Sequence, residues 1–292
     1  MQPTTHKTGW SFHWGVIRAE LLKSLKIFLR YPAELIGFSV FPILWVVPLV
    51  FQGRALTGGT RSAGFAALTG TEHYLAYVMV GALVSTYVFS SLYGMGGSIR
   101  EESYYGTLEI LLSSPASKLA ILLGKGFSDS AISTVMVLVQ IGLCMFFFHL
   151  HVNLAMMVPI VIAMASLVIG LYGLGIGLAG LTLRYKETRG ITHMLNQMMF
   201  LFTPLRYPVE VSSIARSVSV WIPITYALAV IRGAGLLGKN MRELLPSLGK
   251  LIVIDFIFLG VGIGLFYLLE SRSRKAGMLG STDEGGVFPP LG

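Results

Sequence analysis

Six segments of the chain are long, apolar and nearly free of charge, and they constrain its fold more than any other feature. Their approximate limits are 33–51, 73–94, 119–148, 154–183, 191–205 and 248–269. The hydrocarbon core of a bilayer is about 30 Å thick, so a helix of about 20 apolar residues crosses it. A helix also pairs its own backbone polar groups, which lipid does not do. The pattern therefore predicts an all-α integral membrane protein with six transmembrane helices.

The composition excludes soluble classes of protein. Of the 292 residues, 54% are hydrophobic and 12% are charged, whereas soluble domains carry about 25% charged residues. The net charge of +8 is explained by Lys and Arg in cytoplasmic loops and beside anionic lipid, so we expect no nucleic-acid partner. The single cysteine, Cys144, excludes an internal disulfide.

Residues 1–32 precede the first span and contain an amphipathic segment. Its apolar residues recur every three or four positions at Trp14, Ile17, Leu21, Leu25 and Phe28. Lys23, Lys26 and Arg30 project from the opposite side. This spacing predicts a helix over 10–30 that lies in the membrane interface. A packed helix of a small soluble prelude is the alternative.

Loop charges predict the orientation of the chain. Segments on the same side as the amino terminus hold more Lys and Arg than the segments on the other side. The positive-inside rule then places both termini in the cytoplasm. The family resemblance described below implies the plasma membrane of a prokaryote. Residues 33–270 would form the transmembrane domain, and 271–292 a cytoplasmic tail.

The segment between the fifth and sixth spans contains two short apolar runs. Residues 214–220 and 222–231 are each too short to cross a bilayer. They predict a re-entrant helical pair that enters the outer leaflet and returns, because irregular backbone in a membrane must be covered by protein or water. A peripheral loop at the outer surface is the alternative.

No catalytic or metal-binding constellation stands out in the sequence. A Gly-x-x-x-x-Gly-Lys-Ser/Thr loop is missing, so this chain alone does not cradle ATP phosphates and we do not expect an enzyme. Glycines of the fourth and sixth spans instead predict close helix packing. They are Gly173, Gly175, Gly177, Gly180, Gly260 and Gly264.

Three ionisable side chains fall inside the predicted spans. Lys125 and Asp129 are one turn apart in the third span, a spacing that permits an ion pair and neutralises two charges that are costly in hydrocarbon. Snorkelling of Lys125 to the cytoplasmic surface is the alternative. Asp255 stands alone in the sixth span and requires a partner on another helix, a protonated state or a water-filled cavity. A substrate contact and a structural hydrogen bond are both open for it.

The polar interval between the second and third spans carries the most informative motif. Over 98–117 it reads Ser-Ile-Arg-Glu-Glu-Ser-Tyr-Tyr-Gly-Thr-Leu-Glu-Ile-Leu-Leu-Ser-Ser-Pro-Ala-Ser. This run resembles the cytoplasmic segment that joins the same two spans in type-2 ATP-binding-cassette (ABC-2) export permeases. A second similarity is the Pro-rich region that ends in Trp-Ile-Pro-Ile-Thr-Tyr over 221–226, where Ile222 replaces the usual Asn of the family.

The resemblance implies a coupling helix over about 98–115 that seats on an ATPase subunit. The candidate ATPase-coupling residues are Arg100, Glu101, Glu102, Tyr105, Gly106, Thr107, Leu108 and Glu109. The candidate residues in and beside the re-entrant region, about 206–232, are Pro204, Pro208, Pro223, Thr225 and Tyr226.

The resemblance also implies a function. The chain would be the permease subunit of an ABC exporter that moves an amphipathic substrate, either a hydrophobic drug or antibiotic or a lipid-linked glycan. Its partners would be two ATPase subunits, which hold the ATP and Mg, a second permease in a homodimer or heterodimer, and membrane lipid. No cofactor is expected in this chain. An ion-coupled secondary transporter and an intramembrane enzyme are the alternatives.

Overall fold

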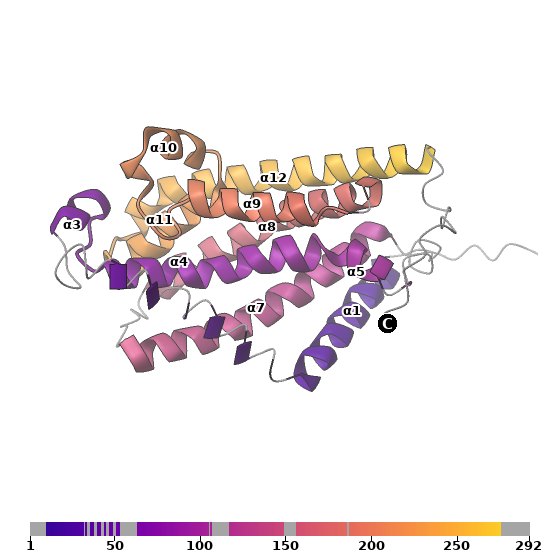
Figure 1. Ribbon diagram of the computed structural model, residues 1–292, viewed down its shortest axis with the longest axis horizontal. Coiled ribbons are helices and arrows are strands. Elements are labelled where there is room, and N and C mark those ends of the chain that lie inside the picture. The colour runs from indigo at the N-terminus through magenta and orange to yellow at the C-terminus, as the bar shows by residue number, and fades with distance from the viewer. Residues whose placement is uncertain are drawn as a thin grey trace, which may run out of the picture.

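The computed structural model describes residues 10–31, scattered positions within 33–52, and 63–104, 106, 117–148, 156–185 and 187–275. These residues form helices and no β-strand, which confirms the all-α fold class. Figure 1 shows long helices running along one axis. The short helix α5 (Ser98–Tyr104) lies at one end of this bundle, together with α1 and the last turns of α12, and α3 (Ala63–Thr69) lies at the other end.

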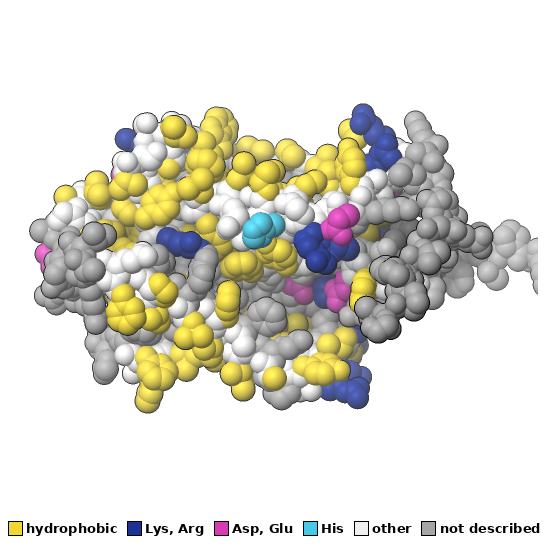
Figure 2. All heavy atoms as spheres, viewed as in Figure 1, with side chains coloured by type: hydrophobic (Ala, Val, Ile, Leu, Met, Phe, Trp, Pro, Cys, Tyr) yellow, Lys and Arg dark blue, Asp and Glu magenta, His cyan; other side chains and the backbone are white. Residues whose placement is uncertain are grey.

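Four described segments are long and apolar enough to cross a bilayer. They are α4 (Tyr74–Phe89) with its π-helical continuation η1 (Ser90–Met95), α7 (Lys118–Phe148), α8 (Met157–Tyr185) and α12 (Met241–Lys275). They correspond to the second, third, fourth and sixth predicted spans. Figure 2 shows hydrophobic side chains along most of the visible face, with most of the visible charged side chains toward the end that holds α5.

The prediction of six transmembrane helices is not confirmed. The first predicted span, 33–51, falls largely outside the described residues. The fifth is represented by α9 (Arg189–Phe202), whose 14 residues extend about 21 Å at 1.5 Å per residue and are too short for the hydrocarbon core. The helix stops because Thr203 takes an extended conformation before Pro204, as residues before proline commonly do.

The predicted amphipathic helix is α1 (Trp10–Arg30), and it packs along α7. Phe28 is buried, whereas Trp14 and Leu25 of the predicted apolar face stay exposed. The close contact depends on Gly124 of α7, where a methyl group would lie 3.2 Å from the Cα atom of Ile17. The placement of α1 in the membrane interface stays a prediction.

Helix α8 is central to the bundle because it contacts α12, α11, η1, α5, α7 and α4. Of the four predicted glycines of this helix, Gly173, Gly177 and Gly180 face α12, and Gly175 faces η1. The predicted packing role of the fourth-span glycines is therefore confirmed. For Gly260 and Gly264 it is not confirmed, because no atom of the described residues lies within 4 Å of a methyl group at either position. The glycine of α12 that does contact α8 is Gly262.

Two short helices separate α9 from α12, as predicted for the re-entrant region. They are α10 (Ser213–Ser219), preceded by the 3-10 turn η3 (Val209–Val211), and α11 (Pro223–Gly235). Their axes differ by 95°. Helix α11 packs against α8 and α12, and its Ile224 and Leu228 are fully buried. The pair is thus built into the bundle, which argues against the peripheral loop.

Candidate functional site

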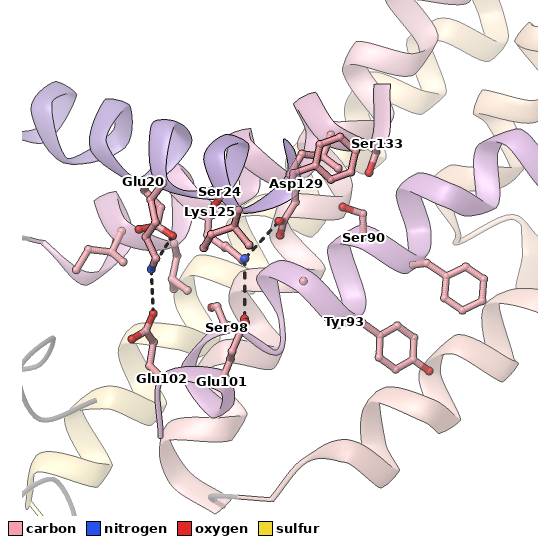
Figure 3. A pocket seen from close by; sticks show the side chains of 18 of the residues that line it. Glu20, Ser24, Ser90, Tyr93, Ser98, Glu101, Glu102, Lys125, Asp129 and Ser133 are labelled. Carbon is pink, nitrogen blue, oxygen red and sulfur yellow. Dashed lines mark hydrogen bonds and ion pairs between the residues drawn. The ribbon is translucent and has the colours of Figure 1, made fainter. Parts of the chain in front are cut away.

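A cavity of about 950 Å³ opens between α1, α4, η1, α5 and α7, and Figure 3 shows it from close by. This volume is in the range of pockets that hold drug-sized ligands. One part of its wall is charged, through Glu20, Lys23, Glu101, Glu102, Lys118, Lys125 and Asp129. Another part is apolar, through Ile27, Phe28, Phe89, Ile121, Leu122, Ile132 and Met136. The cavity is therefore amphipathic.

The π-helical segment η1 supplies one wall of the cavity. Its wider winding shows in the hydrogen bond that the Gly96 amide donates to the Ser91 carbonyl at 2.9 Å, five residues back. Single π turns inside helices occur frequently at functional sites. The turn brings Gly94 against α7, where a methyl group on Gly94 would lie 2.3 Å from Asp129 Oδ2. The Asp129 carboxylate consequently occupies the space that a side chain at position 94 would fill.

Lys125 connects two of the cavity carboxylates. Its Nζ lies 3.6 Å from Asp129 Oδ1, as the one-turn spacing allowed, and 3.9 Å from Glu101 Oε2 on α5. Figure 3 shows the ammonium group between these two acids. The lysine side chain is 21% exposed, and it points to protein carboxylates. This arrangement favours the ion pair over the snorkelling alternative.

A second set of charges joins α5 to α1. Lys23 Nζ lies 3.4 Å from Glu20 Oε1 and 3.5 Å from Glu102 Oε1. Burial of Lys23 opposes its charged form, but the two carboxylates outweigh this effect, so the pKa of Lys23 is raised above the usual lysine value. The protonated amine therefore links the two helices across the neutral pH range.

Some of the predicted coupling residues form ion pairs within the chain. Arg100 lies 3.8 Å from Glu187 in the connection between α8 and α9, and Glu101 and Glu102 contact α7 and α1 as described above. Gly106 adopts a left-handed φ of +69°, and no atom of the described residues lies within 4 Å of a methyl group placed there. Tyr105 and the segment from Thr107 to Glu109 lie outside the described residues. Whether any of these residues contacts an ATPase stays a prediction.

Another ion pair joins the first turn of α7 to the end of α12. Lys118 Nζ lies 2.9 Å from Glu270 Oε1, and both side chains are mostly buried. The Lys118 charge is thus balanced by a residue that does not line the cavity.

Asp255 lies away from the cavity, at the contact between α12 and α8. It is 1% exposed, and the Ser166 hydroxyl of α8 donates a 2.6 Å hydrogen bond to its Oδ2. Gly170 makes room for it, because a methyl group there would lie 2.0 Å from Oδ1. Of the options that the sequence left open, the structure shows a partner on another helix, Ser166, and the geometry favours the structural hydrogen bond.

The predicted residues of the re-entrant region meet around the α10–α11 pair. Pro208 precedes η3, and Pro223 occupies the first turn of α11, where proline is well tolerated. The Thr225 hydroxyl lies 2.8 Å from that of Ser219, and the Tyr226 hydroxyl donates to the Val220 carbonyl at 3.0 Å. These contacts define the bend between the two helices.

Arg232 on α11 was not among the predicted site residues, although it organises this region. It is 6% exposed and donates to the carbonyls of Pro204 at 2.5 Å, Tyr77 at 2.8 Å and Leu205 at 3.3 Å. Its guanidinium carbon lies 3.4 Å from the centre of the Tyr77 ring. A lone arginine in an apolar run was the available signal in the sequence. The predicted residue Pro204 takes part in this network by accepting a hydrogen bond from Arg232 at its carbonyl oxygen.

Among the described residues, no group of three or more His, Cys, Asp or Glu side chains could hold a metal ion. The main feature of the described geometry is the amphipathic cavity next to α5.

Comparison with known proteins supports a transport role. No curated protein matches the chain. A family model described as ABC-2 family transporter protein matches residues 55–264, which include α4, the interval after it, the α10–α11 pair and most of α12. Because the match covers most of the chain, the protein belongs to the ABC-2 transporter family and is a membrane-spanning permease subunit.

Proposed function

We propose that this permease is the transmembrane subunit of an ATP-driven exporter that moves an amphipathic substrate out of the cytoplasm or the inner leaflet. The observation that carries the proposal is the amphipathic cavity, whose charged side includes Glu101 and Glu102 of α5. The substrate would be a hydrophobic drug or antibiotic, or a lipid-linked glycan. Its apolar body would lie beside α4 and α7.

The ion pairs of α5 suggest how force would reach the cavity. An ATPase that pushes on the segment after α5 would move Glu102 against Lys23 of α1 and Glu101 against Lys125 of α7. Both helices are cavity walls, so the movement would change the shape of the cavity. A substrate that binds the two shapes with different affinity would shift the equilibrium between them, which is the thermodynamic requirement for coupling.

The partners and the orientation follow from the same proposal. Two ATPase subunits would supply the ATP and Mg sites that this chain does not encode, and a second permease, identical or related, would complete the path. The α5 end would face the cytoplasm of a prokaryotic cell. In support, α1 and the last turns of α12 lie at that end (Figure 1), which agrees with two cytoplasmic termini.

Reconstitution tests this function directly. The full chain would be co-expressed with an ATPase encoded beside it, purified through a tag on the permease and reconstituted into proteoliposomes. We expect the ATPase to co-purify, and its ATP hydrolysis to rise with transported substrate. Transport that follows an ion gradient without any ATPase would support the secondary transporter instead. Glu243 is exposed on the first turn of α12. Glu243→Gln should co-purify the ATPase as the wild type does, and it serves as the matched control for carboxylate variants of the cavity.

A further inference from the structure

The side of α1 that lines the cavity changes from charged to apolar along the helix. Glu20 and Lys23 come first, Ser24 follows, and Ile27 and Phe28 come one turn later. Residues that are three or four positions apart share one side of a helix. Over these residues the helix rises about 12 Å at 1.5 Å per residue. A ligand that lies along this side would meet charges, then a hydroxyl group and then hydrocarbon.

The facing wall changes in the same order. Glu101 and Glu102 lie on α5, and Phe89 lies at the end of α4, beyond η1. The charged parts of the two walls coincide, because Lys23 of α1 lies 3.5 Å from Glu102. Figure 3 shows the two acids of α5 side by side below α1. The cavity therefore has a charged end next to α5 and an apolar end farther along the bundle.

The apolar end reaches the surface of the molecule. Ile27 and Phe41 both line the cavity and are 49% and 57% exposed. Exposed apolar side chains of a membrane-spanning chain lie against acyl chains, which are as apolar as leucine. The cavity thus connects a charged end with the hydrocarbon of the surrounding leaflet.

Both signs of charge are accessible at the charged end. The side chains of Lys23 and Glu101 are each 54% exposed. An ammonium group has three N–H donors and a carboxylate about four acceptor sites, so each group can bind a ligand and keep its partner within the chain. A ligand with adjacent groups of both signs is complementary to this end, whereas a ligand of a single sign would meet a like charge there.

We propose that the cavity binds a zwitterionic phospholipid of the inner leaflet, with its phosphate at Lys23, its primary ammonium at Glu101 and an acyl chain along Ile27 and Phe28. From headgroup to tail, such a lipid presents ammonium, phosphate, ester oxygens and hydrocarbon. The walls present carboxylate, ammonium, the Ser24 hydroxyl and apolar side chains in the matching order. The lipid is a resident ligand and not the cargo, which goes beyond the proposed transport function. It would link α1 to α5 until an amphipathic substrate displaces it.

Three lipids with the same acyl chains test the headgroup. Phosphatidylethanolamine carries phosphate and ammonium, phosphatidylethanol carries phosphate alone, and diacylglycerol carries neither. Each is titrated into the delipidated full-length permease in detergent, without any ATPase, and bound lipid is counted by native mass spectrometry. We expect one molecule of phosphatidylethanolamine to bind about tenfold more tightly than phosphatidylethanol, the scale of one hydrogen bond to a charged group. Equal affinity for these two lipids, or no saturable binding of phosphatidylethanolamine, would overturn the proposal.

Substitutions then assign the residues. Glu101→Gln should lower the affinity for phosphatidylethanolamine about tenfold, to that of phosphatidylethanol, and should not weaken phosphatidylethanol itself. Lys23→Gln should weaken both phosphate lipids about tenfold and bring them toward diacylglycerol. Glu243→Gln, at a residue that is not among those that line the cavity, should leave all three affinities unchanged.

Each variant is interpreted with its own pair of lipids, which keeps the test decisive. Both side chains are half-exposed and tolerate substitution. If one variant nevertheless fails to fold, the other one decides. A folded Glu101→Gln permease that still prefers phosphatidylethanolamine, or a folded Lys23→Gln permease that still prefers phosphatidylethanol over diacylglycerol, would refute the site. Failure of lipid binding with intact ATPase assembly would remove the lipid site alone, whereas loss of ATPase assembly with intact lipid binding would remove only the exporter.

Discussion

Replacing Gly262 by alanine should destabilise the permease by separating α8 from α12. A methyl group at this position would lie 1.9 Å from the carbonyl oxygen of Gly173, whereas ordinary contacts begin near 3.4 Å. The two helices form the most extensive contact among the described elements. They would have to move apart by more than 1 Å, and the neighbouring side chains along both helices would lose contact.

The size of the effect follows from two opposing contributions. Overpacking of a well-packed contact costs about 1–3 kcal/mol. Alanine in place of glycine in a helix returns up to about 1 kcal/mol of helix propensity, and this gain applies to every glycine of α12. At Gly264 no atom of the described residues lies within 4 Å of the added methyl group, so only the gain remains. The gain is common to both variants and cancels in the comparison. We therefore expect Gly262→Ala to be less stable than Gly264→Ala by about 1–3 kcal/mol, the cost of overpacking.

Thermal denaturation of the detergent-purified full chain, followed by size-exclusion chromatography, measures this difference. Gly264→Ala should melt at or above the wild-type temperature, and Gly262→Ala well below it. Gly173→Ala is the reciprocal variant, because its methyl group would lie 2.3 Å from the Phe258 carbonyl oxygen, and it should resemble Gly262→Ala. Equal melting temperatures for the Gly262 and Gly264 variants would refute the close contact between α8 and α12.

Three further predictions concern other parts of the molecule. Arg232→Lys should reduce the free energy of unfolding by about 1–3 kcal/mol and so lower the melting temperature. One ammonium group does not bond three separate carbonyls and also stack on a ring. An unchanged melting temperature would contradict this role of Arg232. Glu102→Lys should weaken ATPase co-purification. Adding Lys23→Glu should restore it, because the exchanged pair re-forms the contact between α5 and α1. If the double variant co-purifies as little ATPase as the single one, Glu102 belongs to the ATPase surface instead. Gly106→Ala should insert normally but capture less ATPase, because its φ of +69° costs an L-residue about 1 kcal/mol; wild-type capture would argue against a strained bend in the coupling segment.

Much of the fold was predictable because long apolar runs limit the choices of a chain in lipid. The bounds of α7 and α8 agree with the predicted spans 119–148 and 154–183 to within three residues. The end of α9 was misjudged because apolar composition continues past Phe202, while the backbone already turns at Thr203. Local chemistry at the following proline, rather than hydrophobicity, decides that boundary.

The site was less predictable because its contacts join distant segments. The one-turn spacing indicated the Lys125–Asp129 pair, whereas Lys23 and Glu102 are 79 residues apart in the sequence. Periodicity tells which side of a helix is polar and does not tell which helix faces it. For the same reason the sequence did not distinguish Gly262, which contacts α8, from Gly260 and Gly264, which contact no other described helix.

The two sides of the molecule differ in how firmly their helices are joined, and this difference bears on mechanism. Helices α8 and α12 touch through their backbones at Gly173 and Gly262, so no flexible side chain separates them there. By contrast, α5 is linked to α1 and α7 by ion pairs of 3.5 Å and 3.9 Å whose members are partly exposed, and such pairs contribute about 0–1 kcal/mol each. Together the two pairs contribute about 0–2 kcal/mol, which is comparable to the roughly 1–3 kcal/mol that typically couples two sites. Helix α5 also packs on α8, and its Ile99 is buried. The cavity lies between α1, α5 and α7, so a force on α5 that breaks these ion pairs would change its shape.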